Sequence, residues 1–455
     1  MKNVLVSGFY QDYLLDAIVN LEKDEVISVK KWIVGDQESP VDHLNRVWWW
    51  DIVYKEEFAS NVGLNEQETD YLMARYHFFE QQIVREKIFE LDTSNEIHNI
   101  IFKFIYYFKS IIVSSAVDTV LFSDVPHGAY DVILYYVAKM MKIRTLFCMS
   151  SFWPGESFIL EDLNDIGKFK YDKSDRRVSL DRKYEKRLPY MDKPSRKDKM
   201  MRKAKMFFNF LRYVQDKKLT FNRNRLIYGS TKHYILKHCE RFIKRNIEQR
   251  TYKELYKKYF NDSIKINEKF VYFPLHLQPE MTTDTLGGIY YDQLLAVEML
   301  RNILPVDWYI YIKENPKQIY YMRGRRFFER LKSMHNIRLI SKDVNTYDLM
   351  SKSEFVATIT GTAGWEAISG GKNALVFGHA WYRYLSGVSQ YHDAITVEDI
   401  LSRNIDFNIL EREVFALKKT MYNFSCNEYY KKESNLDDKE NLLNLIDALR
   451  HRIIY

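Results

Sequence analysis

The sequence predicts an α/β protein with two Rossmann-like domains that face a cleft, and three observations support this fold class. The chain has 455 residues, more than a single hydrophobic core usually holds, so two domains are expected. Apolar residues make up 46% of the chain, which is enough to fill two cores. After Gly287 and Gly288, helical and strand patterns alternate with short breaks. This alternation is typical of right-handed βαβ units with a parallel sheet covered on both faces.

The first predicted domain spans residues 1–160. Its expected strands and helices follow the apolar patterns at 3–7, 26–34, 66–115, 119–122, 130–141 and 144–148. A polar cluster follows the strand at 119–122, and it contains Asp124 and His127. These two residues are candidate catalytic groups, although a histidine that caps an element or supports the core would fit His127 equally well. Glu156 lies at the tip of the next loop and is a further candidate carboxylate.

Residues 161–265 differ from the rest and are predicted to form a basic, mostly helical insert or linker. Between residues 168 and 258, Lys and Arg outnumber Asp and Glu by roughly three to one. A solvated insert between domains would have this composition. A surface that docks on anionic lipid headgroups or on an acidic polysaccharide would also have it. No nucleic acid partner is expected, because no recognisable nucleic-acid module accompanies the charge.

The third region, residues 266–395, begins with a predicted strand at 270–273 that Pro274 ends. Just after it, His276, Gln278 and Glu280 alternate with less polar residues. In an extended backbone the three polar side chains would project to one side. They lie where open α/β sheets bind ligands, beyond the carboxyl end of a strand. The alternative is a solvated loop whose polar groups satisfy their own turn.

Two later strand ends of this region also carry polar groups. Strands are expected at 308–312, 337–340, 354–359 and 374–377, with helices at 290–304, 325–334, 346–350 and 365–369. Lys313 and Asn315 follow the first of these strands, and Thr360, Gly361 and Thr362 begin a glycine-rich turn after the third. Free backbone N–H groups at such a turn suit a phosphate, and Lys313 would add a positive charge. A simple glycine helix cap is the alternative. Helices in residues 396–455 are expected to close the chain.

Three runs in this region resemble the bacterial capsule polysaccharide biosynthesis proteins related to the Kdo transferases. They are PLHLQPEMTTDTLGG at 274–288, KENP at 313–316 and TGTAGWEAISGGKNALVFGHAWY at 360–382. The resemblance is good over residues 118–160 and 269–390. It implies a GT-B glycosyltransferase that uses a CMP-activated ulosonic acid as co-substrate, with no metal requirement expected. It also implies a C-terminal tail that crosses back onto the first domain.

The resemblance assigns roles to individual residues. The QPE motif of the family matches at Gln278, Pro279 and Glu280, and an analogous Pro-His pair in the N-terminal domain matches His127. The His-Pro motif of the family, implicated in holding CMP, corresponds here to Asn315-Pro316. Because Asn can donate a hydrogen bond but cannot carry a charge, this position departs from the family pattern.

The predicted function is transfer of Kdo or a related acidic sugar from a CMP-activated donor to a capsular or lipid-linked glycan. His276, Gln278, Lys313, Asn315 and residues 360–362 would hold the donor, in a C-terminal donor domain that faces an N-terminal acceptor domain. Glu280, or the pair Asp124 and His127, would supply the base. A carboxylate nucleophile is the alternative if the sugar configuration is retained. Two rival functions are transfer of a polyol phosphate from a CDP donor and a non-catalytic polysaccharide-binding scaffold.

The expected location is the cytoplasm, at the inner face of the cytoplasmic membrane. The three cysteines are widely scattered, which suits a reducing compartment. The first apolar run is too short for a signal peptide. The apolar stretch at 100–117 is interrupted by Lys103 and Lys109, so we expect an amphipathic helix there rather than a membrane span.

Overall fold

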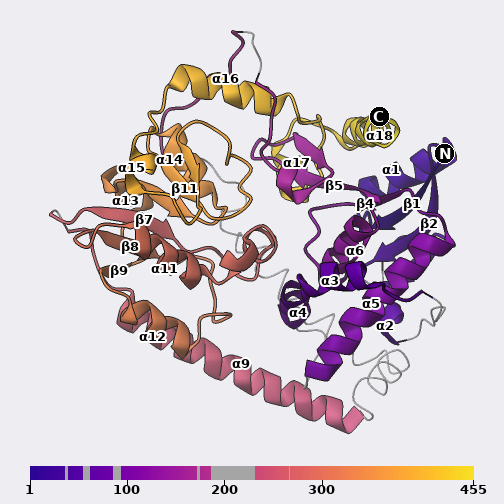
Figure 1. Ribbon diagram of the computed structural model, residues 1–455, viewed down its shortest axis with the longest axis horizontal. Helices are drawn as coiled ribbons and strands as arrows, with labels where there is room; N and C mark the ends of the chain where they lie inside the picture. The colour runs from indigo at the N-terminus through magenta and orange to yellow at the C-terminus, as the bar shows by residue number, and fades with distance from the viewer. Residues whose placement is uncertain (36–38, 55–61, 86–93, 172–174, 186–230, 266) are drawn as a thin grey trace.

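The computed structural model contains two α/β domains, each built on a six-stranded sheet (Figure 1). It describes residues 1–35, 39–54, 62–85, 94–171, 175–185, 231–265 and 267–455. Two Rossmann-like domains in a GT-B-like arrangement, with helices at the C-terminal end, confirm the predicted fold class. Much of the basic segment, residues 186–230, lies outside the described residues.

The first sheet has the strand order β3-β2-β1-β4-β5-β6 and is parallel apart from the antiparallel pair β5 and β6. Its strands are β1 (Lys2–Ser7), β2 (Ile27–Val34), β3 (Arg46–Trp48), β4 (Thr119–Phe122), β5 (Arg144–Ser150) and β6 (Ser157–Leu160). Its helices are α1 (Asp12–Lys23), α2 (Trp49–Tyr54), α3 (Glu66–Met73), α4 (Tyr76–Arg85), α5 (Ser94–Ser114) and α6 (Ala129–Met140).

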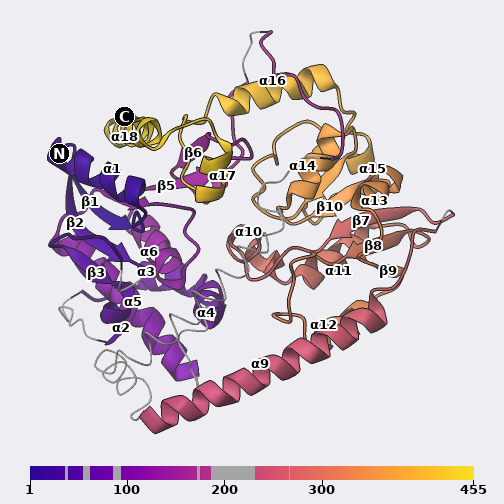
Figure 2. The same ribbon diagram turned by 180° about the vertical axis from the view of Figure 1, so that it is seen from behind.

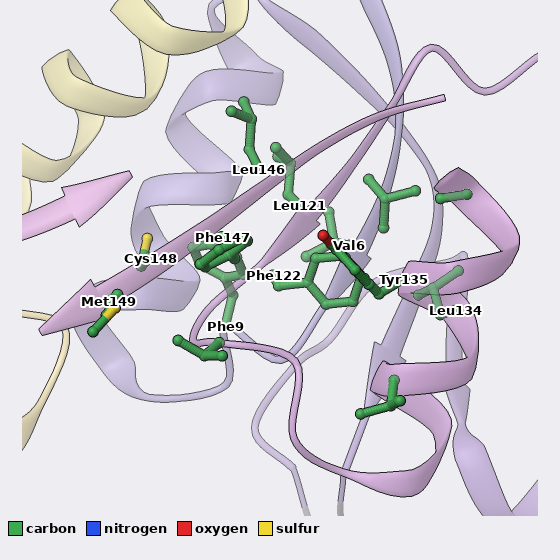
Figure 3. Packing of buried hydrophobic residues seen from close by; sticks show 14 of the residues in the cluster. Val6, Phe9, Leu121, Phe122, Leu134, Tyr135, Leu146, Phe147, Cys148 and Met149 are labelled. Atoms are coloured by element: carbon green, nitrogen blue, oxygen red, sulfur yellow. The ribbon is translucent and has the colours of Figure 1, made fainter. Parts of the chain in front are cut away.

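The central strands of the first sheet are continuously apolar, as expected for strands whose two faces are both covered by helices. Val4, Leu5 and Val6 of β1 are fully buried. Phe122 and Phe147 from neighbouring strands and Tyr135 from α6 pack into the same core, as Figure 3 shows. This packing holds the carboxyl ends of β1 and β4 side by side.

The second sheet is entirely parallel and has the order β12-β11-β10-β7-β8-β9. Its strands are β7 (Phe270–Pro274), β8 (Tyr309–Lys313), β9 (Ile337–Ile340), β10 (Val356–Thr358), β11 (Ala374–Val376) and β12 (Val388–Gln390). Its helices are α10 (Met281–Asp284), the 3-10 turn η3 (Gly288–Tyr291), α11 (Gln293–Ile303), α12 (Arg325–Ser333), α13 (Thr346–Lys352), α14 (Thr362–Ser369) and α15 (Val397–Leu401).

Alternate residues of β7 enter two separate apolar clusters, one on each face of the sheet. Val271 and Phe273 belong to one cluster, and Phe270 and Tyr272 belong to the other. The strand is therefore buried on both sides, as a central parallel strand should be. In each sheet the strand order reverses next to a central strand, between β1 and β4 and between β7 and β10. Ligands of open α/β sheets bind at such points.

The C-terminal tail crosses back onto the first domain, as the family resemblance implied (Figure 1). Its helices are α16 (Phe407–Lys418), α17 (Glu428–Glu433) and α18 (Asp438–Ile454). Tyr422 exchanges two backbone hydrogen bonds with Ser157 of β6, and α18 packs on α1. The helix α9 (Thr231–Tyr259) packs against α12 at one end and extends beyond it, as the reverse view in Figure 2 also shows.

Three features of the fold differ from the predicted elements. The helical patterns expected at 66–115 include a break at 74–75, between α3 and α4, that was not predicted because no Gly or Pro marks it. The short strands β6 and β12 were not predicted, and α14 begins three residues earlier than expected, at Thr362. Among the described residues, no helix is both long enough and apolar enough to cross a membrane.

Candidate functional site

His276 lies in the loop after β7 and is buried against the turn that follows β10. Its Nε2 is 2.9 Å from the hydroxyl of Thr358. Gln293 fixes its backbone, because the Oε1 of Gln293 accepts from the His276 N–H at 2.7 Å and the Nε2 of Gln293 donates to the His276 carbonyl at 3.1 Å. Burial, and secondly the charge of Arg323, lower the pKa of His276 to about 4. The imidazole is therefore neutral near pH 7 and acts as a hydrogen-bonding group.

Gln278 is also buried, where it joins a network that sequence reasoning missed. Its Oε1 accepts from Gln293 at 2.6 Å and from Arg323 at 3.0 Å. Arg323 also donates to both carboxylate oxygens of Glu314, at 2.8 and 3.3 Å. The side chains of this ion pair are only 1% and 2% exposed. Glu314 belongs to the KENP run, but nothing in the sequence indicated its partner.

Glu280 separates from His276 and Gln278, so the expectation that all three share one side of the loop is wrong. The backbone is still extended at Glu280 and turns into α10 at Met281, but His276 and Gln278 are buried and Glu280 is not. The residue is exposed, and its Oε2 accepts from the Thr282 hydroxyl at 3.0 Å. Desolvation of the carboxyl group raises the pKa of Glu280, while Thr282 and Lys317 oppose the rise.

The turn after β10 comes close to His276 and to α10. The Thr360 hydroxyl donates to the carbonyl of Thr282 at 2.6 Å, and the Gly361 N–H donates to Thr358 Oγ1 at 3.3 Å. A Cβ atom added at Gly361 would lie 3.0 Å from His276 Nε2, so this close approach favours glycine. Gly361 caps α14, of which Thr362 is the first residue. The start of α14 and a neutral histidine therefore adjoin each other, an arrangement that suits an anionic phosphate.

Lys313 and Asn315 lie at the end of β8, beside α13. The Lys313 ammonium donates to the Val344 carbonyl and, at 3.1 Å, to the Thr346 hydroxyl. Burial lowers the pKa of Lys313. The Oδ1 of Asn315 accepts from the Lys317 N–H at 3.0 Å, which stabilises a local turn. Both side chains are thus engaged next to β8, while the glycine-rich turn follows β10.

In the first domain, a pocket of about 480 Å³ opens at the ends of β1 and β4, and its lining includes Asp124, His127, Asp131 and Arg85. Burial raises the pKa of Asp124, although His127 and the Val125 N–H oppose the rise. His127 Nδ1 is 2.7 Å from the Val125 carbonyl. Because a carbonyl only accepts, Nδ1 donates in this contact, and Nε2 is the ring nitrogen left to face the pocket residues.

Arg85 joins this pocket to the loop that carries Glu280. Its guanidinium lies 3.4 Å from Asp284 Oδ2 and also donates to the His127 carbonyl. Asp284 Oδ2 accepts from the Glu280 N–H at 3.1 Å, and its backbone carbonyl accepts from Gln82 at 2.9 Å. These contacts connect the candidate bases of the two domains. No sequence signal distinguished Arg85, which lies at the end of a helix.

A cluster of aromatic rings also joins the domains. Phe152 and Trp153 follow β5 of the first domain, and Trp365 and Trp381 belong to the second. The ring centroids of Trp153 and Trp381 are 5.2 Å apart, and those of Phe152 and Trp381 are 5.8 Å apart. Glu156, the further candidate carboxylate, is 2.9 Å from Lys418 of α16 and is held in an ion pair.

Comparison with known proteins decides the family. A family model described as capsule polysaccharide biosynthesis protein matches residues 191–425, which is more than half of the chain. The chain belongs to the capsule polysaccharide biosynthesis protein family. No curated protein matches this capsule biosynthesis protein.

Several solved structures are similar to this capsule biosynthesis protein at low identity. The Thermosulfurimonas dismutans KpsC β-Kdo 2,7 transferase is 13% identical, with 79% of this chain and 91% of that chain covered and a TM-score of 0.33. The β-Kdo 2,4 transferase of the same KpsC is 11% identical, with 74% and 88% covered and a TM-score of 0.30. The Neisseria meningitidis UDP-GlcNAc 2-epimerase is 15% identical, with 100% of both chains covered and a TM-score of 0.24.

In this capsule biosynthesis protein, the predicted site residues form two groups and leave two outside. His276, Thr360, Gly361 and Thr362 come together at the switch point between β7 and β10. Gln278 belongs to the same group, because Gln293 donates both to its side chain and to the His276 carbonyl. Asp124 and His127 line the pocket of the first domain, and Arg85 connects them to Glu280. Lys313 and Asn315 remain beside β8.

Proposed function

We propose that this protein is a glycosyltransferase that moves an acidic sugar, Kdo or a related ulosonic acid, from a CMP-activated donor to a capsular or lipid-linked glycan. The observation that carries the proposal is the contact between the pocket of the first domain and the loop of the second domain that carries Glu280. Arg85 touches both the His127 carbonyl and Asp284, and Asp284 holds the backbone of Glu280. Transfer between two substrates requires such a junction, where one domain offers the donor and the other the acceptor.

The donor phosphate would lie at the start of α14. Backbone N–H groups of its first turn and the hydrogen-bonding imidazole of His276 would face the departing charge. Gln278 would act indirectly, because the Gln293 and Arg323 contacts bury its side chain. Lys313 would have to exchange its Val344 and Thr346 partners for the donor. The proposal requires no metal ion.

Two groups are candidates for the base that deprotonates the acceptor hydroxyl. Asp124 and Glu280 both have raised pKa values from desolvation, and a carboxylate with a raised pKa is a better proton acceptor. His127 would assist through Nε2. Asp124 lies inside the pocket of the first domain, which favours it for an acceptor bound there, and Glu280 would serve an acceptor closer to α10.

A donor screen tests this function. The purified protein is incubated with CMP-Kdo, another CMP-ulosonic acid, a CDP-polyol or a UDP-sugar, each with a lipid-linked glycan acceptor, and products are detected by mass spectrometry. Transfer from a CMP-ulosonic acid alone is the expected result. Transfer only from the CDP-polyol would contradict the proposed donor and favour polyol phosphate transfer. Binding of the glycan without transfer from any donor would favour a scaffold. Activity that persists in EDTA would agree with the metal-free proposal.

The protein would work as a peripheral protein at the inner face of the cytoplasmic membrane, held there by α9. Tyr252 and Leu255 are buried nearer its end, whereas Ile243 and Ile247, one turn apart and nearer its start, are 58% and 59% accessible. Between residues 243 and 259 it carries six Lys and Arg against two Glu. Exposed apolar side chains next to basic ones are typical of helices that lie on anionic membranes.

Liposome sedimentation tests this docking. Vesicles that contain phosphatidylglycerol should retain the protein at low salt and lose it as salt shortens the screening length, since each basic residue near the surface adds about 1 kcal/mol. Substitution of Ile243 and Ile247 by Ser should weaken retention. Equal recovery with phosphatidylcholine vesicles at low salt would leave α9 as a solvated helix.

A further inference from the structure

A second pocket, of about 580 Å³, lies beside the pocket of the first domain. It is formed where α1 meets the C-terminal helices α17 and α18. Figure 1 shows α18 beside α1, and Lys431 of α17 contacts Tyr13 of α1. Both pockets have Gln11 in their lining. They therefore adjoin each other, and together they extend from Asp124 and His127 to the start of α18.

The walls of the second pocket carry donors and acceptors of both charges. Its polar lining comprises Gln11, Tyr13, Asp16, Lys431, Asp438 and Lys439. This mixture does not favour a phosphate, which needs an excess of cations, or a lipid tail, which needs an apolar wall. Amide, carboxylate and ammonium groups side by side match the many hydroxyls of a sugar, each of which both donates and accepts.

The contacts within the pocket fix some of these groups in place. The Tyr13 hydroxyl donates to Gln11 Oε1 at 3.2 Å, which orients the amide between the two pockets. Lys431 lies 4.3 Å above the Tyr13 ring and is paired with Asp438 at 2.5 Å. Asp16 of α1 and Lys439 of α18 are exposed. Preorganised polar groups lower the entropy cost of holding a flexible ligand.

We infer that the second pocket is a distal subsite for the glycan acceptor, which binds the sugar units that precede the reacting one. The inference rests on the proposed function, because the reacting unit is placed beside Asp124 and His127. Each pocket has a volume within the range of about 300–1,000 Å³ that is usual for small-ligand sites. One pocket would hold the reacting unit, and the second would hold the chain behind it. The protein would therefore favour acceptors of several sugar units.

Acceptor length tests the inference. Transfer is measured with acceptors of one and of four units of the same glycan, using the wild-type protein, Lys439→Ala and Asp16→Ala. The wild-type protein should have a lower KM for the four-unit acceptor. Each substitution should raise that KM about tenfold relative to the KM for the one-unit acceptor, with kcat little changed, as expected for loss of about 1.4 kcal/mol of binding. Lys432→Ala, which alters an exposed neighbour outside the pocket lining, is the matched control.

The possible results separate the inference from the proposed function. Equal KM values for the two acceptors in the wild-type protein, or equal effects of Lys439→Ala and Lys432→Ala, would overturn the subsite and leave the transferase intact. If no donor supports transfer, the proposed function fails, and calorimetric binding of the four-unit oligosaccharide decides the subsite. Binding that weakens in Lys439→Ala but not in Lys432→Ala would support the subsite, and binding unaffected by either would overturn it.

Discussion

Replacement of Glu314 by Gln should destabilise the second domain, because it leaves the charge of Arg323 buried without a counter-ion. Both side chains are almost completely buried, and two hydrogen bonds join them. Loss of one partner from a buried ion pair costs about 3–5 kcal/mol. Gln keeps the volume and one carbonyl acceptor, and Arg323 keeps its bonds to Gln278 and the His276 carbonyl. We therefore expect the free energy of unfolding of the second domain to fall by about 3 kcal/mol, the lower end of this range.

Hydrogen exchange followed by mass spectrometry gives the local effect of Glu314→Gln in a two-domain protein. Peptides from residues 270–325 should exchange faster in this variant, and peptides of β1 and β4 should be unchanged. Glu329→Gln on α12 is the matched control, because Glu329 is exposed. The free energy of opening over residues 270–325 should therefore fall. A decrease of less than about 1 kcal/mol would refute the reasoning, because a solvent-exposed ion pair contributes about that much to stability.

Three further predictions concern the site. Glu280→Gln should leave the melting temperature and CMP binding near native while it slows transfer by about 10²-fold or more; a near-native rate would transfer the role of base to Asp124 or His127. Lys313→Ala should weaken CMP binding by about 1–3 kcal/mol, the cost of a lost charge-assisted hydrogen bond, and unchanged affinity in a folded variant would exclude Lys313 from the donor site. The unfolded chain protonates His276 near pH 6.5 but the folded protein only near pH 4, so stability should fall as pH decreases through this window, by about 2 kcal/mol at pH 5. A His276→Gln variant should lack this part of the pH dependence. If urea unfolding gives the wild-type protein and the variant the same dependence of stability on pH, the prediction is wrong.

Local patterns in the sequence determined most of the secondary structure of the second domain. The run at 270–273 became β7, the pattern at 325–334 became α12, and the glycine-rich turn opened a helix. These signals are local, because hydrophobic periodicity and turn residues act over ten or so neighbouring positions. The short strands β6 and β12 escaped prediction because three or four residues at the edge of a sheet do not make a period.

The composition of the site depended on contacts that no local pattern contains. His276 meets Thr358 across 82 positions, and Gln82 meets Asp284 across 202. The first contact exists because β10 pairs with β7 in the sheet, and the second because the two domains touch.

The sequence by itself thus determined which strand ends carry polar groups. Only the tertiary structure decided that His276 adjoins Gly361, that Lys313 turns to α13, and that Arg85 connects the domains. Strand order and domain contact come from packing of the whole chain, and that packing places distant residues at one site.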